Sequence, residues 1–419
     1  MISVQNLQLQ SNGSNFWLKL VSFLFLIGMV TSCVPRSQVV KPDGGPVILE
    51  PTKPSEEVTE ETQPVREQYE IALMLPFQLN RSTGQNPTST DLERAELALD
   101  FYQGFKLGLE KQTSQGTDFK LEVLDSRDNE EEVRRLVSRS EVKDALLVVG
   151  PIFPKEISAF GDAAVLKNSN TLQISPLAAT MPTEFNLPNL VSITSPILTH
   201  VRALAQRIVE AYQPGDVVLL YESDETSSQQ FLNPLKTIIL QLNRNIALYE
   251  VKSKERLEEL VHFDGKNLVV SGSSNRFQVL AMLEQLRLLR DQSGHRFQLF
   301  GHPNWAKISF PDESGLQSFQ TIISSTYYID PRQIAVRDFR TWYRDEFTIE
   351  PSEFAYKGYD TGMYFGLLLS RHGKDYSKHL VDTEFEGLHN SFQFEYNSKW
   401  GFVNQAIHFL RFNDGHFVR

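Results

Sequence analysis

Short runs of apolar residues alternate with longer amphipathic stretches over most of this chain of 419 residues. The run 71–75 (IALML) is typical of a strand that is buried on both faces of a sheet. In the stretch that follows, Leu97, Phe101, Phe105 and Leu109 recur at every fourth position, which places them on one face of a helix. The pattern therefore predicts a buried strand followed by an amphipathic helix.

The same alternation continues to about residue 195. We expect strands over 119–124, 145–149, 171–174 and 190–193, and helices over 91–111, 130–140 and 155–167. Strands that alternate with helices through short connections form right-handed β-α-β units, in which helices cover a parallel sheet. This part of the chain is therefore expected to form one such sheet.

A second run of the pattern begins after an expected helix at 198–211. We expect strands over 217–221, 246–251, 268–271 and 297–300, and helices over 229–242, 256–262 and 276–290. The tail differs, because 393–396, 401–403 and 407–412 are short strand-like segments that end in a hairpin. The fold class that follows is α/β, with two mostly parallel sheets, each flanked by helices.

The N-terminal segment carries a different signal. Residues 20–30 (LVSFLFLIGMV) form an apolar run of 11 residues, which suits a secretory signal and is shorter than the roughly 20 residues that span a bilayer. Small residues then lead to Cys33, the only cysteine, which has no partner for an internal disulfide. This arrangement resembles the lipobox of bacterial lipoproteins, although Lys19 is the only basic residue before it. The resemblance implies a signal peptide over 1–32 and a lipid on Cys33; the alternative is a cysteine buried in the core.

Residues 33–68 are expected to be a tether. Residues 34–68 hold six prolines and the acidic cluster Glu56, Glu57, Glu60 and Glu61, with few periodic apolar positions. Such a segment buries too little surface to order itself, and proline favours an extended spacer. The tether would hold a folded body away from the membrane.

Composition excludes one class of partner. The chain is 41% hydrophobic and 22% charged, as expected of a soluble globular body, with a net charge of −11. An acidic protein without a basic block lacks the electrostatic footprint of a nucleic-acid binder. No second apolar run is long enough to span a membrane, so the membrane contact is expected to be the lipid alone.

Three segments together resemble a known fold. They are 148–151 (VVGP), 173–180 (QISPLAAT) and 354–362 (FAYKGYDTG). In this order they are similar to motifs of the type I periplasmic-binding fold, the kind that binds leucine, isoleucine or valine. The resemblance implies two α/β lobes with three crossovers between them. It places one lobe at 69–195 plus 327–385 and the other at 196–326 plus 386–419.

Ligands of open α/β sheets bind beyond the carboxyl ends of the strands. The candidate ligand-binding residues are therefore those that follow expected strands. They are Phe77, Phe153, Ser175, Ala178, Thr180, Glu222, Ser273, Trp305 and Tyr327. Core packing for the phenylalanines and Trp305, and helix capping for Ser175 and Thr180, are the alternatives.

The sequence departs from the amino-acid binders of this family. In those proteins the loop after the Gly-Pro strand supplies a hydroxyl and backbone N–H groups for the carboxylate of the ligand. Here the loop 152–155 (IFPK) has no hydroxyl, and Pro154 removes one N–H donor. Residues 222–227 lack the Tyr-Gly pair of the second lobe, and 302–305 (HPNW) stand in the region of the usual acidic residue. Ala178 and Thr180 still match.

No catalytic motif stands out. The zinc-protease, nucleophile-elbow and phosphate-loop patterns are absent, and the nine histidines are scattered without a close pair at metal-ligand spacing. Asp125, Arg127 and Asp128 cluster after an expected strand, where a solvated loop is the simplest interpretation. We expect neither an enzyme, nor a metal, nor a cofactor.

Two functions remain open, and the first is the leading interpretation of the sequence. The first is a lipid-anchored binding protein that closes its lobes on a small solute, such as an amino acid or peptide, for an ABC permease. The second is an interaction lipoprotein, because similar two-lobed domains occur in outer-membrane lipoproteins that activate penicillin-binding proteins, which are cell-wall synthases. The missing carboxylate-binding residues and the tether favour the second. Both place the protein in the cell envelope, facing the periplasm, and the non-acidic Val34 after Cys33 favours the outer membrane.

Overall fold

The computed structural model describes residues 68–80, 86–113, 117–162, 171–310 and 314–419. The chain divides into the units Met1–Gln63 and Pro64–Arg419, and every described residue belongs to the second unit. The expected signal peptide, Cys33 and nearly all of the tether lie outside the described residues.

The first sheet has seven strands in the order β13-β14-β5-β4-β3-β1-β2. All neighbours are parallel except β13 and β14, which form an antiparallel pair. The strands are β1 (Gln68–Leu75), β2 (Asp118–Asp125), β3 (Leu147–Val149), β4 (Leu172–Ser175), β5 (Leu190–Ser192), β13 (Phe394–Asn397) and β14 (Gly401–Asn404). We call this sheet and its helices the first lobe.

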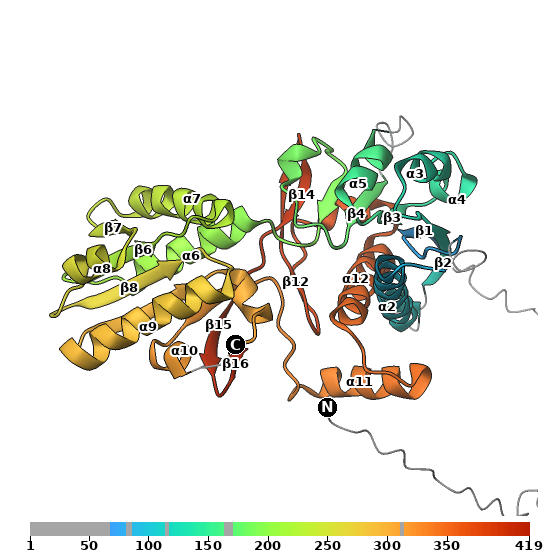
Figure 1. The fold of residues 1–419 in the computed structure, drawn as a ribbon. Helices are drawn as coiled ribbons and strands as arrows, with labels where there is room; N and C mark the ends of the chain where they lie inside the picture. Colours follow the sequence, from blue (N-terminus) through green and yellow to red (C-terminus); the bar gives the residue numbers. More distant parts are fainter. Residues whose placement is uncertain (1–67, 81–85, 114–116, 163–170, 311–313) are drawn as a thin grey trace, which may run out of the picture. The chain divides into compact units, whose positions relative to one another are not determined.

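Helices cover both faces of the first sheet (Figure 1). Ile71 and Leu73 of β1 share a core with α2 (Ser89–Thr113) and α12 (Glu353–His372). The alternate residues Ala72 and Met74 face the other core. That core holds side chains of α3 (Glu130–Leu136), α4 (Ser140–Lys143) and α5 (Pro154–Gly161). Burial on both faces explains why β1 is a continuous apolar run.

Helices α2 and α12 pack closely because both present glycine at their contact. A Cβ atom on Gly104 would lie 1.9 Å from the carbonyl oxygen of Ala355, and one on Gly358 would lie 2.1 Å from that of Phe101. Larger residues at these positions would force the helix axes apart. The sequence pattern predicted α2, but of α12 it indicated only a helix start within 354–362.

The second sheet also has seven strands, in the order β16-β15-β10-β9-β8-β6-β7. Its strands are β6 (Val217–Tyr221), β7 (Leu248–Val251), β8 (Lys266–Ser271), β9 (Arg296–Gly301), β10 (Ile322–Ser325), β15 (His408–Asn413) and β16 (His416–Val418). β15 pairs antiparallel with both β10 and β16, and the other neighbours are parallel. This sheet and its helices form the second lobe.

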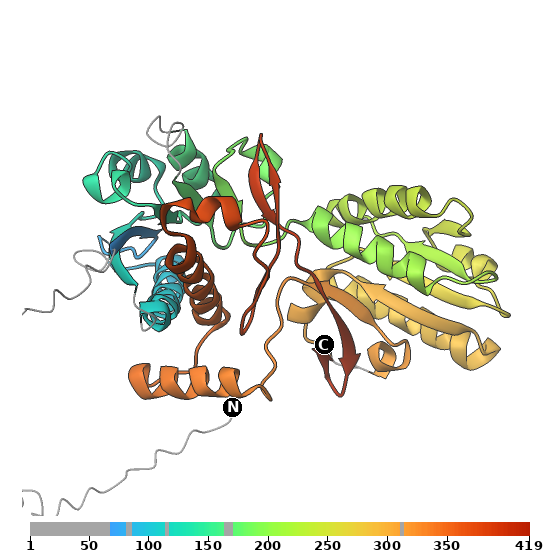
Figure 2. The ribbon, with the colours of Figure 1, turned by 180° about the vertical axis from the view of Figure 1, so that it is seen from behind.

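The second sheet is also sandwiched between helices (Figure 2). One core contains α6 (Ile197–Ala211) and α7 (Thr226–Leu242). The opposite core contains α8 (Lys254–Leu260), α9 (Arg276–Ser293), α10 (Ser314–Ser318) and the short helix η2 (Pro303–Lys307). The predicted α/β class with two helix-flanked sheets is confirmed.

The chain passes between the two sheets three times, as the resemblance implied. It crosses from β5 to α6, from β10 to α11 (Ile334–Phe347), and from β14 to β15. The expected boundary at residue 386 needs correction, because β13 and β14 extend the first sheet and the last crossing falls between Asn404 and His408. The pairing of β14 with β5 assigns residues 394–404 to the first lobe, and no pattern within those residues predicts this pairing.

Hydrogen bonds join the crossing segments to one another. Residues 327 and 390 form an antiparallel bridge, and the Tyr328 N–H donates to the carbonyl of His389 at 2.9 Å. The Nδ2 group of the buried Asn404 donates to the carbonyls of Ile193 and Ser391 at 3.0 and 2.9 Å. All three crossing segments therefore share a connected set of hydrogen bonds.

Most other predicted elements are confirmed, with changes at their ends. The stretch expected to be one helix over 130–140 is divided into α3 and α4, with Arg139 extended between them. Helix α5 ends at Gly161, and residues 163–167 of the expected helix lie outside the described residues. The short helices η1 (Pro182–Glu184) and η3 (Gly373–His379) and the ribbon β11 (Phe385–Glu386) with β12 (Ser391–Phe392) complete the fold.

Candidate functional site

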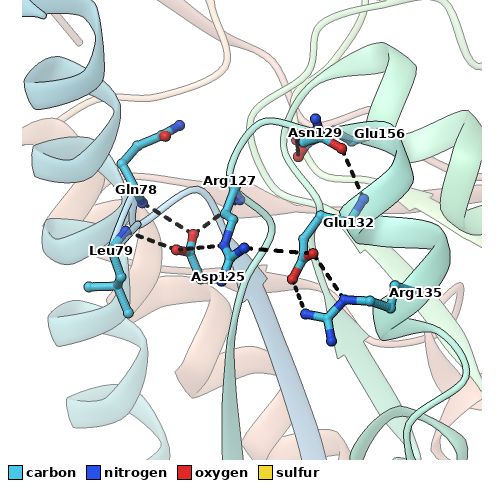
Figure 3. Close-up of polar contacts among 8 residues, drawn as sticks. All are labelled: Gln78, Leu79, Asp125, Arg127, Asn129, Glu132, Arg135 and Glu156. Atoms are coloured by element: carbon cyan, nitrogen blue, oxygen red, sulfur yellow. Dashed lines mark hydrogen bonds and ion pairs between the residues drawn. The ribbon is translucent and has the colours of Figure 1, made fainter. Parts of the chain in front are cut away.

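The N-terminus of α5 is where the resemblance places the carboxylate of a ligand, and here a side chain of the protein lies there. Glu156 is in the first turn of α5 and is 1% exposed. Its carboxyl group lies beside Asn129 (Figure 3), whose N–H it accepts at 3.2 Å. It also accepts the N–H of Phe153 at 3.4 Å. A carboxyl group of the chain itself therefore accepts the N–H of the residue that caps α5, and it also joins this helix end to the cap of α3.

Burial dominates the electrostatics of Glu156. Removal from water raises the pKa of its carboxyl group to about 7, and the nearby Asp128 raises it further. Hydrogen bonds from the backbone N–H groups of Phe153 and Asn129 oppose this effect without reversing it. Nothing in the local sequence distinguishes Glu156 from an ordinary helix-start glutamate, so the sequence analysis missed it.

The predicted ligand-stacking rings of the first lobe already have partners within the protein. The guanidinium of Arg94, on α2, lies 5.2 Å from the centre of the half-buried Phe153 ring and also pairs with Asp128. Phe77 packs edge-on against Tyr102, with ring centres 6.1 Å apart. Both rings lie against the first core, which favours the packing alternative.

Asp125 at the end of β2 organises the neighbouring loops, contrary to the expected solvated loop. Its carboxylate accepts the N–H groups of Gln78, Leu79 and Arg127 at 3.1, 2.9 and 3.0 Å (Figure 3). Gln78 and Arg127 both have a φ of 58°, which non-glycine residues rarely adopt. The hydrogen bonds to Asp125 account for this backbone conformation, and the Asp125 side chain is only 9% exposed.

The segment 173–180 of the first lobe leaves one polar atom without a hydrogen bond. Ser175, at the end of β4, is 1% exposed, and its hydroxyl has no hydrogen-bond partner among the described residues. Ala178 packs against a small cluster that includes Ile157, and Thr180 is half-buried. Ser175 therefore remains a ligand-binding candidate, whereas Ala178 has a packing role.

The second lobe has a cavity of about 400 Å³ beside the ends of β6 and β8. Glu222, Asp224, Lys252 and Ser273 are among its lining residues, and the ammonium of Lys252 lies 3.5 Å from the Glu222 carboxylate. The Ser273 hydroxyl donates to Glu225 at 2.5 Å. The structure therefore brings two predicted residues, Glu222 and Ser273, to one cavity.

Trp305 is a core residue, and the expectation that it forms binding surface is wrong. It is fully buried, packs edge-on against Phe310, and donates its indole N–H to the Ser273 carbonyl at 2.8 Å. A Cβ atom on Gly301 would lie 2.2 Å from the indole ring. Tertiary packing of η2 against α9 and β9 buries this side chain, which no sequence period could show.

Tyr327 lies in the second crossing and belongs to a cluster that spans both lobes. Its ring stacks on that of His389, with centres 4.5 Å apart and planes 2° from parallel. The ammonium of Lys307, at the end of η2, lies 5.8 Å from the centre of the Tyr327 ring and 3.0 Å from the carboxylate of Glu353, the first residue of α12. Burial raises the pKa of Tyr327, which keeps its hydroxyl neutral.

Asp360, expected near a helix start, lies in the middle of α12 and holds the turn between β11 and β12. It is fully buried, and its carboxyl group accepts the N–H groups of residues 388, 389 and 390 at 2.7, 2.8 and 2.7 Å. A Cβ atom on Gly387 would lie 2.3 Å from the Asp360 carboxyl carbon, so only glycine fits there. The role of Asp360 is structural.

Two wider searches concern only the described part of the chain. Within it, no group of three or more histidine, cysteine, aspartate or glutamate side chains is placed to hold a metal ion. The same residues include no helix with the length and apolarity needed to cross a bilayer.

Comparison with known proteins identifies the fold. No protein-family model matches the sequence, and no curated protein matches it. A putative branched-chain amino acid ABC transporter from Rhodospirillum rubrum is 15% identical with a TM-score of 0.57; the match covers 83% of this chain and 99% of that one. The LpoA (YraM) C-domain from Haemophilus influenzae, a regulator of PBP1A, is 12% identical with a TM-score of 0.52, over 84% and 99%.

An ABC transporter substrate-binding protein from Desulfitobacterium hafniense is similar to the same degree, at 14% identity, a TM-score of 0.52, and coverage of 84% and 99%. These likenesses establish that residues from about 68 onward have the two-lobed type I periplasmic-binding fold. Solute-binding proteins and a regulator share this fold, so function has to be argued from the sites.

Proposed function

We propose that this protein is a lipid-anchored interaction protein of the cell envelope, whose two-lobed body binds and regulates a cell-wall synthase and carries no free amino acid. The observation that carries the proposal is the Glu156 carboxyl group at the N-terminus of α5. It accepts the N–H of Phe153, a donor at this helix end that an amino-acid binder would keep available for its ligand, and it occupies the space beside it.

Displacing Glu156 would be costly for a ligand. Its side chain is 1% exposed, so an incoming carboxylate would have to push a buried carboxyl group away from two backbone donors. An unpaired buried polar group costs about 1–3 kcal/mol, and a ligand would have to supply this from its own contacts. The rings of Phe77 and Phe153 are half-buried against the first core, which leaves less of their surface for an aliphatic side chain.

The remaining features support a protein partner. The likeness to the LpoA C-domain shows that this fold serves as a regulator of a synthase in another bacterium. The 34 residues between a lipid on Cys33 and the first strand, which begins at Gln68, would allow the body to reach a partner embedded in the membrane. We therefore place the protein in the periplasm on a lipid anchor, at the outer membrane.

The second-lobe cavity favours a second candidate function. Its volume of about 400 Å³ lies in the range of small-molecule sites, and Glu222 and Asp224 give it acidic groups that suit an amine. In this alternative the protein binds a small cationic solute for an ABC permease. The solute would first bind in the cavity of the second lobe, and no carboxylate of the solute would be held at the N-terminus of α5.

Cross-linking in intact cells, followed by affinity purification of the full chain, tests the proposal. We expect enrichment of a cell-wall synthase, and loss of that enrichment in the Cys33→Ser variant, which cannot be acylated. Enrichment of an ABC permease would support the second candidate. A third outcome, recovery of neither class from wild-type cells, would count against both.

A further inference from the structure

Lys357 is a buried lysine whose amino group has no counterpart among the described residues. Lys357 is 9% exposed, on the inner side of α12, and its ammonium makes no hydrogen bond or ion pair within the described residues. Burial lowers the pKa of Lys357 to about 8, with Glu353 opposing and Lys307 adding to this effect. A buried, unpaired cation is expensive, and such groups gather at sites that bind or react.

A second unused polar atom belongs to His389, whose pKa is lowered by burial and also by the charge of Lys357. His389 is 2% exposed, and its Nε2 atom has no partner among the described residues. Its Nδ1 atom lies 2.6 Å from Oδ1 of Asn390, while Nδ2 of Asn390 donates to the Thr326 carbonyl at 3.5 Å. This orientation of Asn390 makes Nδ1 of His389 the donor and leaves Nε2 as an acceptor.

The surrounding groups come from both lobes. Glu353 and Lys357 are one helical turn apart on α12 of the first lobe, and Lys307 reaches Glu353 from η2 of the second. Tyr327 stacks on His389 and also faces Lys307. Lys307 is 59% exposed and Glu353 34%, so solvent reaches this cluster from their side.

We propose that Lys357, Lys307 and His389 form a binding site between the lobes for the carboxylate end of an acylated amino acid or peptide. The ligand carboxylate accepts hydrogen bonds from Lys357, and its neighbouring amide N–H donates to Nε2 of His389. Two lysines against one glutamate leave one positive charge for the ligand to neutralise. A free amino acid binds poorly, because its ammonium would be placed beside two lysines.

Binding at this site adds a second link between the lobes to the Lys307–Glu353 ion pair, because Lys307 and Lys357 belong to different lobes. The site is separate from the N-terminus of α5 and from the second-lobe cavity. The proposal of a ligand site therefore does not depend on whether a synthase is the protein partner. A carboxylate end of this kind belongs either to an ordinary peptide or to a cell-wall peptide, which ends in a D-amino acid. The L and D forms of one probe distinguish these sources.

Titration calorimetry and thermal shift on the full chain in detergent test the site with three related probes. N-acetyl-alanine, in L or D form, offers a carboxylate and an amide N–H; N-acetyl-alaninamide lacks the carboxylate, and alanine carries an ammonium. We expect N-acetyl-alanine to bind at least about tenfold more tightly than the other two. Tighter binding of either enantiomer supports the site. A preference for the L form identifies an ordinary peptide as the ligand, and a preference for the D form identifies a cell-wall peptide.

Lys357→Met is the decisive variant, with the exposed Lys374→Met as its control. We expect Lys357→Met to weaken N-acetyl-alanine binding at least about tenfold while leaving the protein as stable as wild type, since it removes an unpaired charge. Lys374→Met should bind like wild type. The proposal fails if wild type binds no N-acetyl-alanine at about 10 mM, or if Lys357→Met binds it equally well.

A proton measurement on wild type gives an answer that does not depend on the variant folding. Above pH 8 a free Lys357 is partly neutral, and a bound carboxylate recharges it, so binding should take up a proton. The neighbouring groups do not change their charge at this pH: Lys307 stays protonated, and Tyr327 and His389 stay neutral. The Glu353 carboxylate is paired with Lys307, and the Asp360 carboxyl group accepts the N–H groups of 388–390. Binding heats at pH 8.5 that do not change between buffers of different ionisation enthalpy would overturn the assignment.

Discussion

Replacing Glu156 by glutamine tests whether the N-terminus of α5 is filled by a neutral, buried carboxyl group. Burial raises the pKa of Glu156 from 4.5 to about 7 in the folded protein. A carboxyl group with a raised folded-state pKa favours the fold while it is protonated. Its contribution is therefore full below pH 4.5 and is lost as the pH rises to about 7.

The difference between the two pKa values gives the size of the effect. At about 1.4 kcal/mol for each unit, wild type should lose about 3 kcal/mol of unfolding free energy between pH 4.5 and 8 through this group. Glutamine keeps an oxygen for the N–H groups of Asn129 and Phe153 and does not ionise. Glu156→Gln should therefore match wild type near pH 4.5 and exceed it by about 3 kcal/mol at pH 8.

Urea unfolding followed by tryptophan fluorescence at a series of pH values measures this difference. The exposed Glu131→Gln provides the control and should follow wild type at every pH. The reasoning is refuted if Glu156→Gln is less stable than wild type at pH 8. That result would mean that the helix end requires a negative charge, and an acidic ligand would then be a plausible substitute for Glu156.

Three further substitutions probe the contacts that hold the loops and crossings. Asp125→Ala removes the acceptor of three backbone N–H groups and should cost about 3 kcal/mol in urea unfolding, with Asp118→Ala as a neutral control. Gly387→Ala should speed hydrogen exchange at residues 388–390, because its Cβ would lie 2.3 Å from the Asp360 carboxyl carbon; unchanged exchange would contradict the close contact. Asn404→Ala leaves two carbonyls without their donor and should lower the unfolding free energy by about 2 kcal/mol, and a loss below 0.5 kcal/mol would show that water replaces it.

The sequence was a good guide wherever an element is buried by its own pattern. The four-residue spacing of Leu97 to Leu109 predicted α2, and the run 71–75 predicted β1. Each pattern reports burial of one helix face or of both strand faces, which the local residues determine. The order of these elements, with three short motifs, was enough to indicate two lobes and three crossings.

The sites were harder to predict, because their chemistry depends on which groups meet. Trp305 had the features of a binding residue, yet packing of η2 buries it completely. Glu156 and Lys357 were overlooked because a charged residue in a helix is ordinary until its burial is known. A lysine within the apolar stripe of 354–369 is the one signal that closer reading of the sequence would have revealed.

The amino-acid sequence by itself determined the alternation of strands and helices, the α/β class and the departures from an amino-acid binder in 152–155. These depend on side-chain type and spacing along the chain. Only the tertiary structure decided that β13 and β14 join the first sheet, that Glu156 fills the end of α5, and that Lys357 and His389 share a site with Lys307. Strand pairing, desolvation and contacts between distant segments are properties of the folded chain, so no stretch of sequence contains them.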